Sequence, residues 1–157
     1  ETPSAYSIWN SISFTERRAP TLITRTKTDA KRLATATLAF VGDAVYGLLV
    51  RERLSCMEAP VGELHKASVE KVCAHAQSEA YDRLEDMLGE DELAVLKRGR
   101  NLNSNHVPKN AETLSYRRAT GVEALFGYLY LSGQTDRLTH VMEQAYDVIH
   151  AARTAGL

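Results

Sequence analysis

Cysteine and long hydrophobic runs are scarce in this sequence, and each shortage excludes a class of protein. Cys56 and Cys73 are the only cysteines among 157 residues, and neither belongs to a CxxC pair or to a Cys/His ligand spacing. A disulfide framework and a zinc site of the common spacings are therefore excluded, and we expect free thiols in a cytoplasmic location, or an organellar one in a eukaryote. No apolar run reaches the roughly 18 residues that cross a bilayer, and we expect no signal peptide.

An excess of charge of one sign is also lacking, since the net charge is −1. Two neighbouring segments nevertheless differ sharply. Residues 79–92 hold seven acids and one base, whereas residues 97–118 hold six bases and one acid, a local charge of +5. The basic segment is suited to face phosphates. On charge alone, a solvated basic face that is balanced by the acidic one is the alternative.

Helical spacing dominates after the first 30 residues. Residues 1–30 are rich in Ser, Thr and Pro, and we interpret them as an N-terminal arm, extended or partly ordered with a short helix near Ile8–Phe14, that precedes a single domain over residues 31–157. In that domain apolar residues recur at three- and four-residue steps, and no segment shows strand alternation, so the fold is predicted to be all-α. The predicted helices are Leu33–Leu54, Glu63–Leu88 with a bend and with Gly89 as its end, Glu90–Arg100, Leu114–Ser132 and Thr135–Arg153.

A single acid stands in the middle of each of two otherwise largely apolar helix rows. The first row is Ala36, Phe40, Asp43, Gly47 and Val50, and the second is Tyr116, Thr120, Glu123, Gly127 and Tyr130. In both rows a glycine follows the acid by one turn, although an interior glycine costs a helix about 1 kcal/mol relative to alanine. A close approach of two helix backbones would explain the glycines. We therefore predict that the helices cross at Gly47 and Gly127 and bring Asp43 and Glu123 together.

The predicted pair of acids has the chemistry of a metal site. Two carboxylates at close range repel each other, and a divalent cation relieves that repulsion. Ligation by oxygen alone suits Mg²⁺, with Mn²⁺ as a substitute. The alternative is that each acid lies on a helix surface or caps a neighbouring backbone group. The paired pattern favours the metal site, but spacing alone does not prove that the two side chains meet.

Several blocks of sequence, in order, resemble the Mini-III ribonucleases, the short branch of the ribonuclease III family that has a catalytic domain and no double-stranded-RNA-binding domain. The blocks are LAFVGDAVYGLLVRERL, ELHKAS, LKRGRN, VPKN and YRRATGVEALFGYLYL, between about Leu33 and Ile149. The resemblance implies a homodimeric, all-α endonuclease that cuts double-stranded RNA with Mg²⁺ and leaves 5′-phosphate and 3′-hydroxyl ends. It places Asp43 on the family's GD signature and Glu123 on its EAL signature, as catalytic residues that hold the metal.

The same resemblance implies a biological substrate, a precursor of large-subunit ribosomal RNA, with a ribosomal protein on that substrate as a further partner. Full-length ribonucleases III carry two more acids, where this chain has Ala39 and Thr120. The Mini-III branch resembles this chain at those positions, so we expect an active enzyme with weaker metal affinity. A non-catalytic RNA-binding or ribosome-associated module on the same fold is the alternative function, and the presence of both Asp43 and Glu123 favours the enzyme.

Without a separate RNA-binding domain, the basic segment is expected to supply much of the RNA affinity. Its Lys and Arg side chains are expected to reach the RNA backbone, and two asparagines to reach 2′-hydroxyls or base edges in the wide minor groove. The predicted RNA-binding residues are Lys66, Lys97, Arg98, Arg100, Asn101, Lys109, Asn110 and Arg117. For Arg100 a helix-end charge is the alternative role, and one of the neighbours Arg117 and Arg118 is expected to point to solvent.

Overall fold

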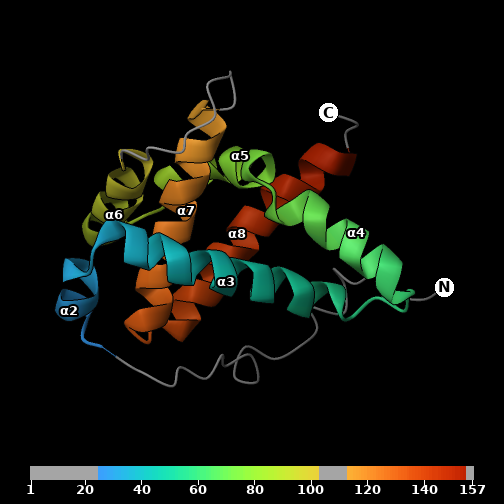
Figure 1. The fold of residues 1–157 in the computed structure, drawn as a ribbon, viewed down its shortest axis with the longest axis horizontal. Coiled ribbons are helices and arrows are strands. Elements are labelled where there is room, and N and C mark those ends of the chain that lie inside the picture. Colours follow the sequence, from blue (N-terminus) through green and yellow to red (C-terminus); the bar gives the residue numbers. More distant parts are fainter. Residues whose placement is uncertain (1–24, 103–112, 155–157) are drawn as a thin grey trace.

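The structure is a computed structural model that describes residues 25–102 and 113–154. Its helices are α2 (Lys27–Arg32), α3 (Thr35–Leu54), α4 (Val61–Val72), α5 (Ala74–Glu85), α6 (Glu90–Arg100), α7 (Thr113–Leu131) and α8 (Thr135–Thr154) (Figure 1). These described residues contain no strand, which confirms the predicted all-α fold. None of the helices in them has both the length and the apolar character that a bilayer span needs. The helix expected near Ile8–Phe14 lies outside the described residues.

The helix predicted from Glu63 to Leu88 is two helices in the structure. The backbone turns to an extended conformation at Cys73, with φ −67° and ψ 153°, and this residue separates α4 from α5. The prediction that Gly89 ends the second helix was wrong, because α5 ends at Glu85 and Gly89 is instead the N-cap of α6. The physical reason is that the Glu92 carboxylate accepts a hydrogen bond from the Gly89 N–H at 3.0 Å, which caps the first turn of α6.

The short helix α2 was not predicted, because six residues are too few to show a hydrophobic period. Its N-cap is Thr26, whose hydroxyl accepts a hydrogen bond from the backbone N–H of Asp29 at 3.1 Å. The guanidinium of Arg98, on α6, donates to the carbonyl oxygens of Lys31 and Leu33 at 2.9 and 3.3 Å. Arg98 therefore fastens the connection between α2 and α3 to the body of the protein.

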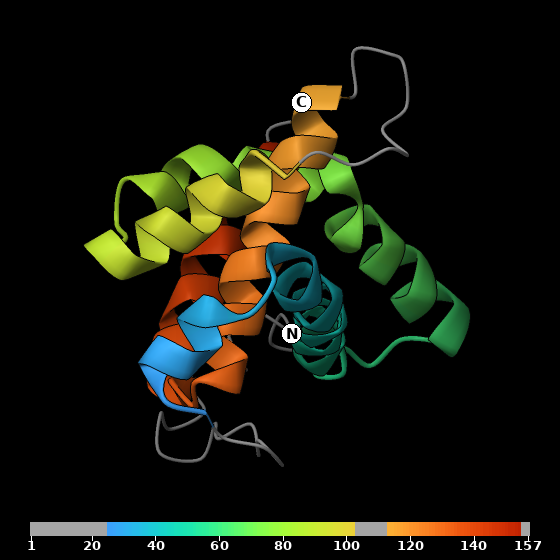
Figure 2. The same cartoon turned by 60° about the vertical axis from the view of Figure 1, so that its left-hand side comes forward.

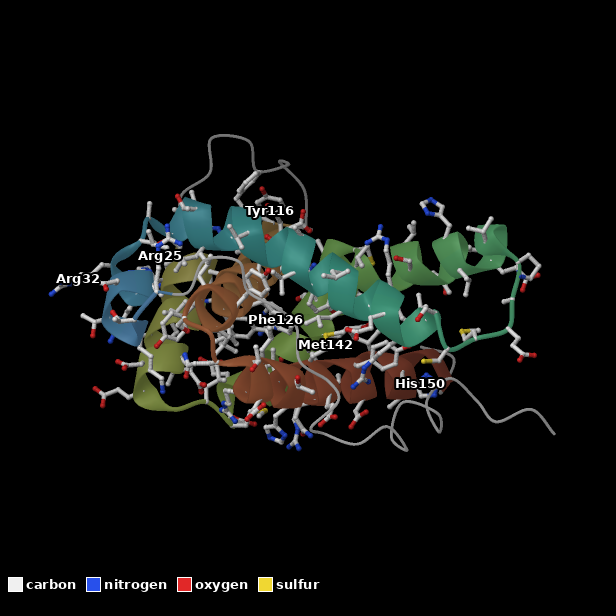
Figure 3. The ribbon with its side chains drawn as sticks, turned by 90° about the horizontal axis from the view of Figure 1, so that it is seen from below. Arg25, Arg32, Tyr116, Phe126, Met142 and His150 are labelled. Carbon is white, nitrogen blue, oxygen red and sulfur yellow. The ribbon has the colours of Figure 1, made fainter. Side chains whose placement is uncertain are left out.

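Helix α7 lies at the centre of the fold and packs against α3, α5, α6 and α8 (Figures 1 and 2). Its middle is buried on every side, and Phe126 meets the edge of the Tyr46 ring from α3 with centroids 5.1 Å apart. Figure 3 shows Phe126 and Met142 in the interior between α3 and α8, whereas Arg32 extends from one end of the molecule. A helix buried all round explains why the α7 sequence has no clear polar face.

Two glycines let α7 approach its neighbours at backbone distance. A Cβ atom on Gly121 would lie 2.8 Å from the Leu96 carbonyl oxygen of α6. A Cβ atom on Gly127 would overlap the Leu38 carbonyl of α3. Since real Cβ atoms do not come this close to backbone atoms, glycine is required at both positions, and α7 is held between α6 and α3.

Candidate active site

The crossing of α3 and α7 fixes the places of the two acids. On α3, however, the glycine at the crossing is not the predicted one. On α3 the contact residue is Gly42, where a Cβ atom would overlap the backbone carbonyl of Glu123. The prediction for Gly47 was wrong: this glycine lies beside Arg51 of its own helix, whose guanidinium donates to the Gly47 carbonyl at 2.9 Å. Because Gly42 and Gly47 are five residues apart, they face directions about 140° apart, and one helix cannot use both against α7.

The two acid-containing rows meet in a pocket of about 430 Å³ at this crossing. Asp43 and Glu123 both line it, so the structure brings together the two acids that spacing paired. The lining residues are Ala36, Ala39, Phe40 and Asp43 of α3, Leu102 after α6, and Tyr116, Arg117, Thr120 and Glu123 of α7. Asp43 is exposed at the rim of the pocket, whereas Glu123 is half-buried.

The electrostatics of the pocket favour a positive ligand. Burial and, to a smaller extent, the nearby negative charge of Asp43 raise the pKa of Glu123 from 4.5 to about 7. A hydrogen bond from the side chain of Gln77, on α5, partly opposes that rise. The pocket is therefore a place where a second negative charge is unfavourable unless a cation neutralises it.

The residues present fit a divalent cation, although with few protein ligands. Carboxylate oxygens are the ligands that Mg²⁺ and Mn²⁺ prefer. The carboxylates of Asp43 and Glu123 both line this pocket. Ala39 and Thr120, where the resemblance noted above implies two further acids in longer enzymes, line the same pocket, and the Thr120 hydroxyl donates to the Tyr116 carbonyl at 3.0 Å. Within the described parts of the chain no group of three or more His, Cys, Asp or Glu side chains is arranged as a metal site. Water or phosphate oxygens would have to complete the ligand shell.

Of the predicted RNA-binding residues that the structure describes, Arg117 is the one that lines the pocket, and its side chain is exposed. Its neighbour Arg118 points away and pairs with Asp82 at 3.1 Å. Asn101 follows the last residue of α6 and directly precedes the pocket residue Leu102, so the end of α6 borders the pocket. Arg117 therefore lies in the same pocket as the two acids, whereas Arg118 is directed toward Asp82 on α5.

Three of the other predicted bases make contacts outside the pocket. Besides Arg98, which fastens the α2–α3 connection, Lys97 pairs with Glu85 at 3.4 Å, and Arg100 lies over the ring of Tyr81 with 5.7 Å to the centroid. Lys66 is exposed on α4 and does not line the pocket. Lys109 and Asn110 lie outside the described residues. For all of these side chains the RNA contact stays a prediction.

Gln77 is the residue at this site that sequence reasoning missed. It lies on α5, which neither acid-containing row includes, and its interaction with Glu123 spans 46 positions of the chain. The signal that could have drawn attention to it is a polar residue on the apolar face of α5, next to Ala76 and one turn before Tyr81. The side chain is 1% exposed, which is rare for glutamine and indicates a specific polar role.

Comparison with known proteins agrees with this arrangement. The ribonuclease III domain family matches residues 36–134, a range that includes both acids and the whole crossing of α3 and α7. The chain belongs to the ribonuclease III family.

Within that family the similar proteins are of the short type. A Mini-ribonuclease 3 from a Thermoanaerobacter species is 46% identical over 125 residues, which cover 79% of this chain and 88% of the relative. A Mini-ribonuclease 3 from Brevibacillus brevis is 44% identical over 113 residues, 71% of this chain and 84% of the relative. A crystal structure of a Fusobacterium nucleatum protein superposes with a TM-score of 0.66 at 29% identity, covering 73% of this chain and 89% of that one. The predicted resemblance to Mini-III ribonucleases and the predicted enzyme class, an endoribonuclease, are confirmed.

Proposed function

We propose that this endoribonuclease cuts double-stranded RNA with Mg²⁺ or Mn²⁺, with Asp43 and Glu123 as its catalytic metal ligands. The observation that carries the proposal is the meeting of these two acids, 80 positions apart, in one pocket at a backbone-close helix crossing. Family membership supports a duplex RNA substrate and a divalent metal. An all-helical protein without a catalytic role would have no reason to keep two repelling carboxylates together.

The roles of the protein's own residues follow from their positions. Asp43 and Glu123 would hold the cation, which supplies Lewis-acid stabilisation of the phosphate and lowers the pKa of a bound water. Glu123, on the most tightly packed helix, provides a fixed ligand, and the exposed Asp43 provides one that solvent and substrate can reach. Arg117, on the pocket wall, would bind a phosphate of the RNA backbone and orient it over the acids.

A second copy of the chain is part of the proposal, because α3 exposes an apolar stripe. Phe40, Ala44 and Leu48 are spaced by one turn each, and the two larger side chains are 80% and 58% exposed. Phe40 also lines the pocket, so the stripe and the pocket are continuous. Pairing of two such stripes would bury them and place two pockets near one interface, where each could cut one strand of a duplex.

A cleavage assay with charge-neutral variants tests the proposal. The wild type, Asp43→Asn and Glu123→Gln are incubated with a long duplex RNA in Mg²⁺, beside Glu58→Gln, which removes an exposed acid in the loop before α4. We expect cleavage by the wild type and by Glu58→Gln and none by the other two. Binding without cleavage by all four proteins would instead support the non-catalytic RNA-binding or ribosome-associated module.

The finer features of the reaction also belong to the proposal. We infer 5′-phosphate and 3′-hydroxyl product ends and a precursor of large-subunit ribosomal RNA as the substrate, and both are supported by the resemblance to Mini-III ribonucleases. End-labelling of the products with and without prior phosphatase treatment tests the end chemistry. Cleavage of precursor transcripts, naked and with their bound ribosomal protein, tests the substrate and the need for that partner.

A further inference from the structure

Two side chains that carry a hydroxyl group line the pocket of the two acids, and both belong to α7: Tyr116 and Thr120. The Thr120 O–H donates to the carbonyl oxygen of Tyr116 at 3.0 Å, so its hydrogen is already used within the helix. The Tyr116 hydroxyl has no hydrogen bond to any residue that the structure describes. Among the described residues of the pocket wall, Tyr116 is therefore the side chain that can still both donate and accept a hydrogen bond.

The geometry of α7 places Tyr116 on the same face as the acid. Tyr116, Thr120 and Glu123 are spaced by four and then three residues, so they share one face of the helix. Tyr116 precedes Glu123 by two turns, which is about 10 Å along the helix axis. Figure 3 shows Tyr116 beside the first half of α3, whose residue Phe40 lines the same pocket. A strand with a phosphate bound at the acids would have its neighbouring sugars within this distance.

The chemistry of Tyr116 suits a sugar better than a phosphate. Its side chain is half-buried, with 37% exposure, so part of the ring is covered by the pocket wall and part is open to a substrate. A ribose has an apolar C–H surface that packs against a ring, and its 2′-hydroxyl both donates and accepts, as the phenol does. A phosphate is charged and is bound more strongly by a guanidinium, which the next residue, Arg117, brings to the same pocket.

We propose that Tyr116 is a specificity-determining residue that exchanges a hydrogen bond with a ribose 2′-hydroxyl near the phosphate that is cut. DNA lacks this hydroxyl, so the contact helps the enzyme to distinguish RNA from DNA. The acids and Arg117 interact with metal and phosphate groups, which do not differ between the two nucleic acids. The inference rests on the proposed function, because it takes this pocket as the place where duplex RNA is cut.

The test removes each partner of the hydrogen bond separately and then both together. Tyr116→Phe removes the hydroxyl and keeps the ring. In a duplex RNA with one mapped cleavage site, each ribose near that site is replaced in turn by a 2′-fluoro sugar, which keeps the A-form pucker but has no O–H. Tyr128→Phe is the matched control, since it removes a phenol hydroxyl from the same helix and lines a different pocket. Circular dichroism establishes that both variants are folded at the assay temperature.

The measured quantity is kcat/KM. We expect one sugar position at which the 2′-fluoro sugar costs the wild type and Tyr128→Phe about three- to tenfold, the effect of one hydrogen bond. Tyr116→Phe should be slower by the same factor on the unmodified duplex and should lose nothing further at that position. Equal losses, or none, in the wild type and Tyr116→Phe at every position would overturn the inference. If the wild type does not cut RNA, the proposed function fails by itself, and the same comparison of binding affinities, measured by fluorescence anisotropy, still decides the role of Tyr116.

Discussion

Gly42 of α3 and Glu123 of α7 touch through their backbones, and no side chain fits between them. Because the catalytic candidate Glu123 is itself the residue at the crossing, the packing of the core and the position of the acid are determined by the same contact. Asp43 follows Gly42 directly, so the contact also sets the place of the second acid. Several expectations follow from this coupling of stability to the site.

Gly42→Ala is expected to destabilise the protein by about 3 kcal/mol or more, because the new methyl group overlaps the Glu123 carbonyl and forces α3 and α7 apart. Urea denaturation measures the effect. The matched control is Gly62→Ala on α4, where nothing lies within 4 Å of the added Cβ atom and the substitution should be neutral or stabilising by up to about 1 kcal/mol. Equal stabilities of the two variants would contradict the crossing.

The stability of the metal-free protein is expected to fall as the pH rises from about 4.5 to 7. The pKa of Glu123 is raised from 4.5 to about 7 in the folded protein, so across this window the folded state keeps a proton that the unfolded state has released. The loss amounts to at most about 3 kcal/mol, and it is complete above the folded-state pKa. Denaturation of the wild type and of Glu123→Gln in EDTA isolates the effect: the variant should become the more stable protein by pH 8. A difference that does not vary with pH would show that Glu123 has an ordinary pKa.

Thr120→Asp is expected to tighten Mn²⁺ binding by about tenfold or more, because it adds a third carboxylate to a pocket that now has two. Calorimetric titration without RNA measures the affinity. For the wild type we expect weak binding, so tight binding of Mg²⁺ at several sites in the same experiment would refute the two-ligand description. Thr120→Asn is the control, because asparagine has the shape of aspartate without its charge. A gain in Mn²⁺ affinity in Thr120→Asp alone would be due to the charge.

Arg117→Ala is expected to weaken duplex RNA binding and to lower the slope of log affinity against log salt by about one, as the loss of one phosphate contact does. Asp43→Asn serves as the background, so that binding is measured without cleavage. Arg83→Ala removes the same charge from α5, where Arg83 bonds Gln144 at 2.6 Å outside the pocket, and should leave the slope unchanged. Identical slopes for the two arginine variants would exclude a phosphate contact at Arg117.

Phe40→Asp is expected to give a monomer at concentrations where the wild type sediments as a dimer, because a charge replaces an 80% exposed ring in the α3 stripe. Analytical ultracentrifugation measures the mass. Val61→Asp removes a side chain that is exposed to the same degree, 81%, but lies on α4, outside the stripe. A wild type that stays monomeric would contradict the dimer, and a dimer lost only through Val61→Asp would place the interface on α4.

The longer helices and the two acid-containing rows could be predicted from the sequence because both depend on local spacing. Residues one turn apart share a face, so the rows through Asp43 and Glu123 anticipate six of the residues that line the pocket. Which glycine makes the crossing could not be predicted in this way. Gly42 and Gly47 are equally small, so their size does not distinguish them. The face of α3 that contacts α7 is the one that carries Gly42 and the Leu38 carbonyl, which lies against Gly127.

Tertiary contacts determine the remaining features, and no local pattern encodes them. Arg98 stands in a basic segment that looks suited to RNA, yet its guanidinium reaches two carbonyl oxygens 65 and 67 positions earlier in the chain. For that reason Arg98→Ala is expected to lose folding stability whatever it does to RNA binding. Gln77 was missed for the same physical cause, since its partner Glu123 belongs to another helix.

The glycines of α7 have a consequence for genetic screens of this enzyme. Gly121 and Gly127 stand on either side of Glu123, each against the backbone of another helix, so we expect substitutions there to lower activity by disturbing the packing that holds the acid rather than by removing a catalytic group. A screen for inactive mutants would score these positions like true catalytic residues. Protein abundance in the same cells would tell the two kinds apart, because we expect a neutralised acid to leave the amount of folded protein unchanged and a substituted glycine to lower it.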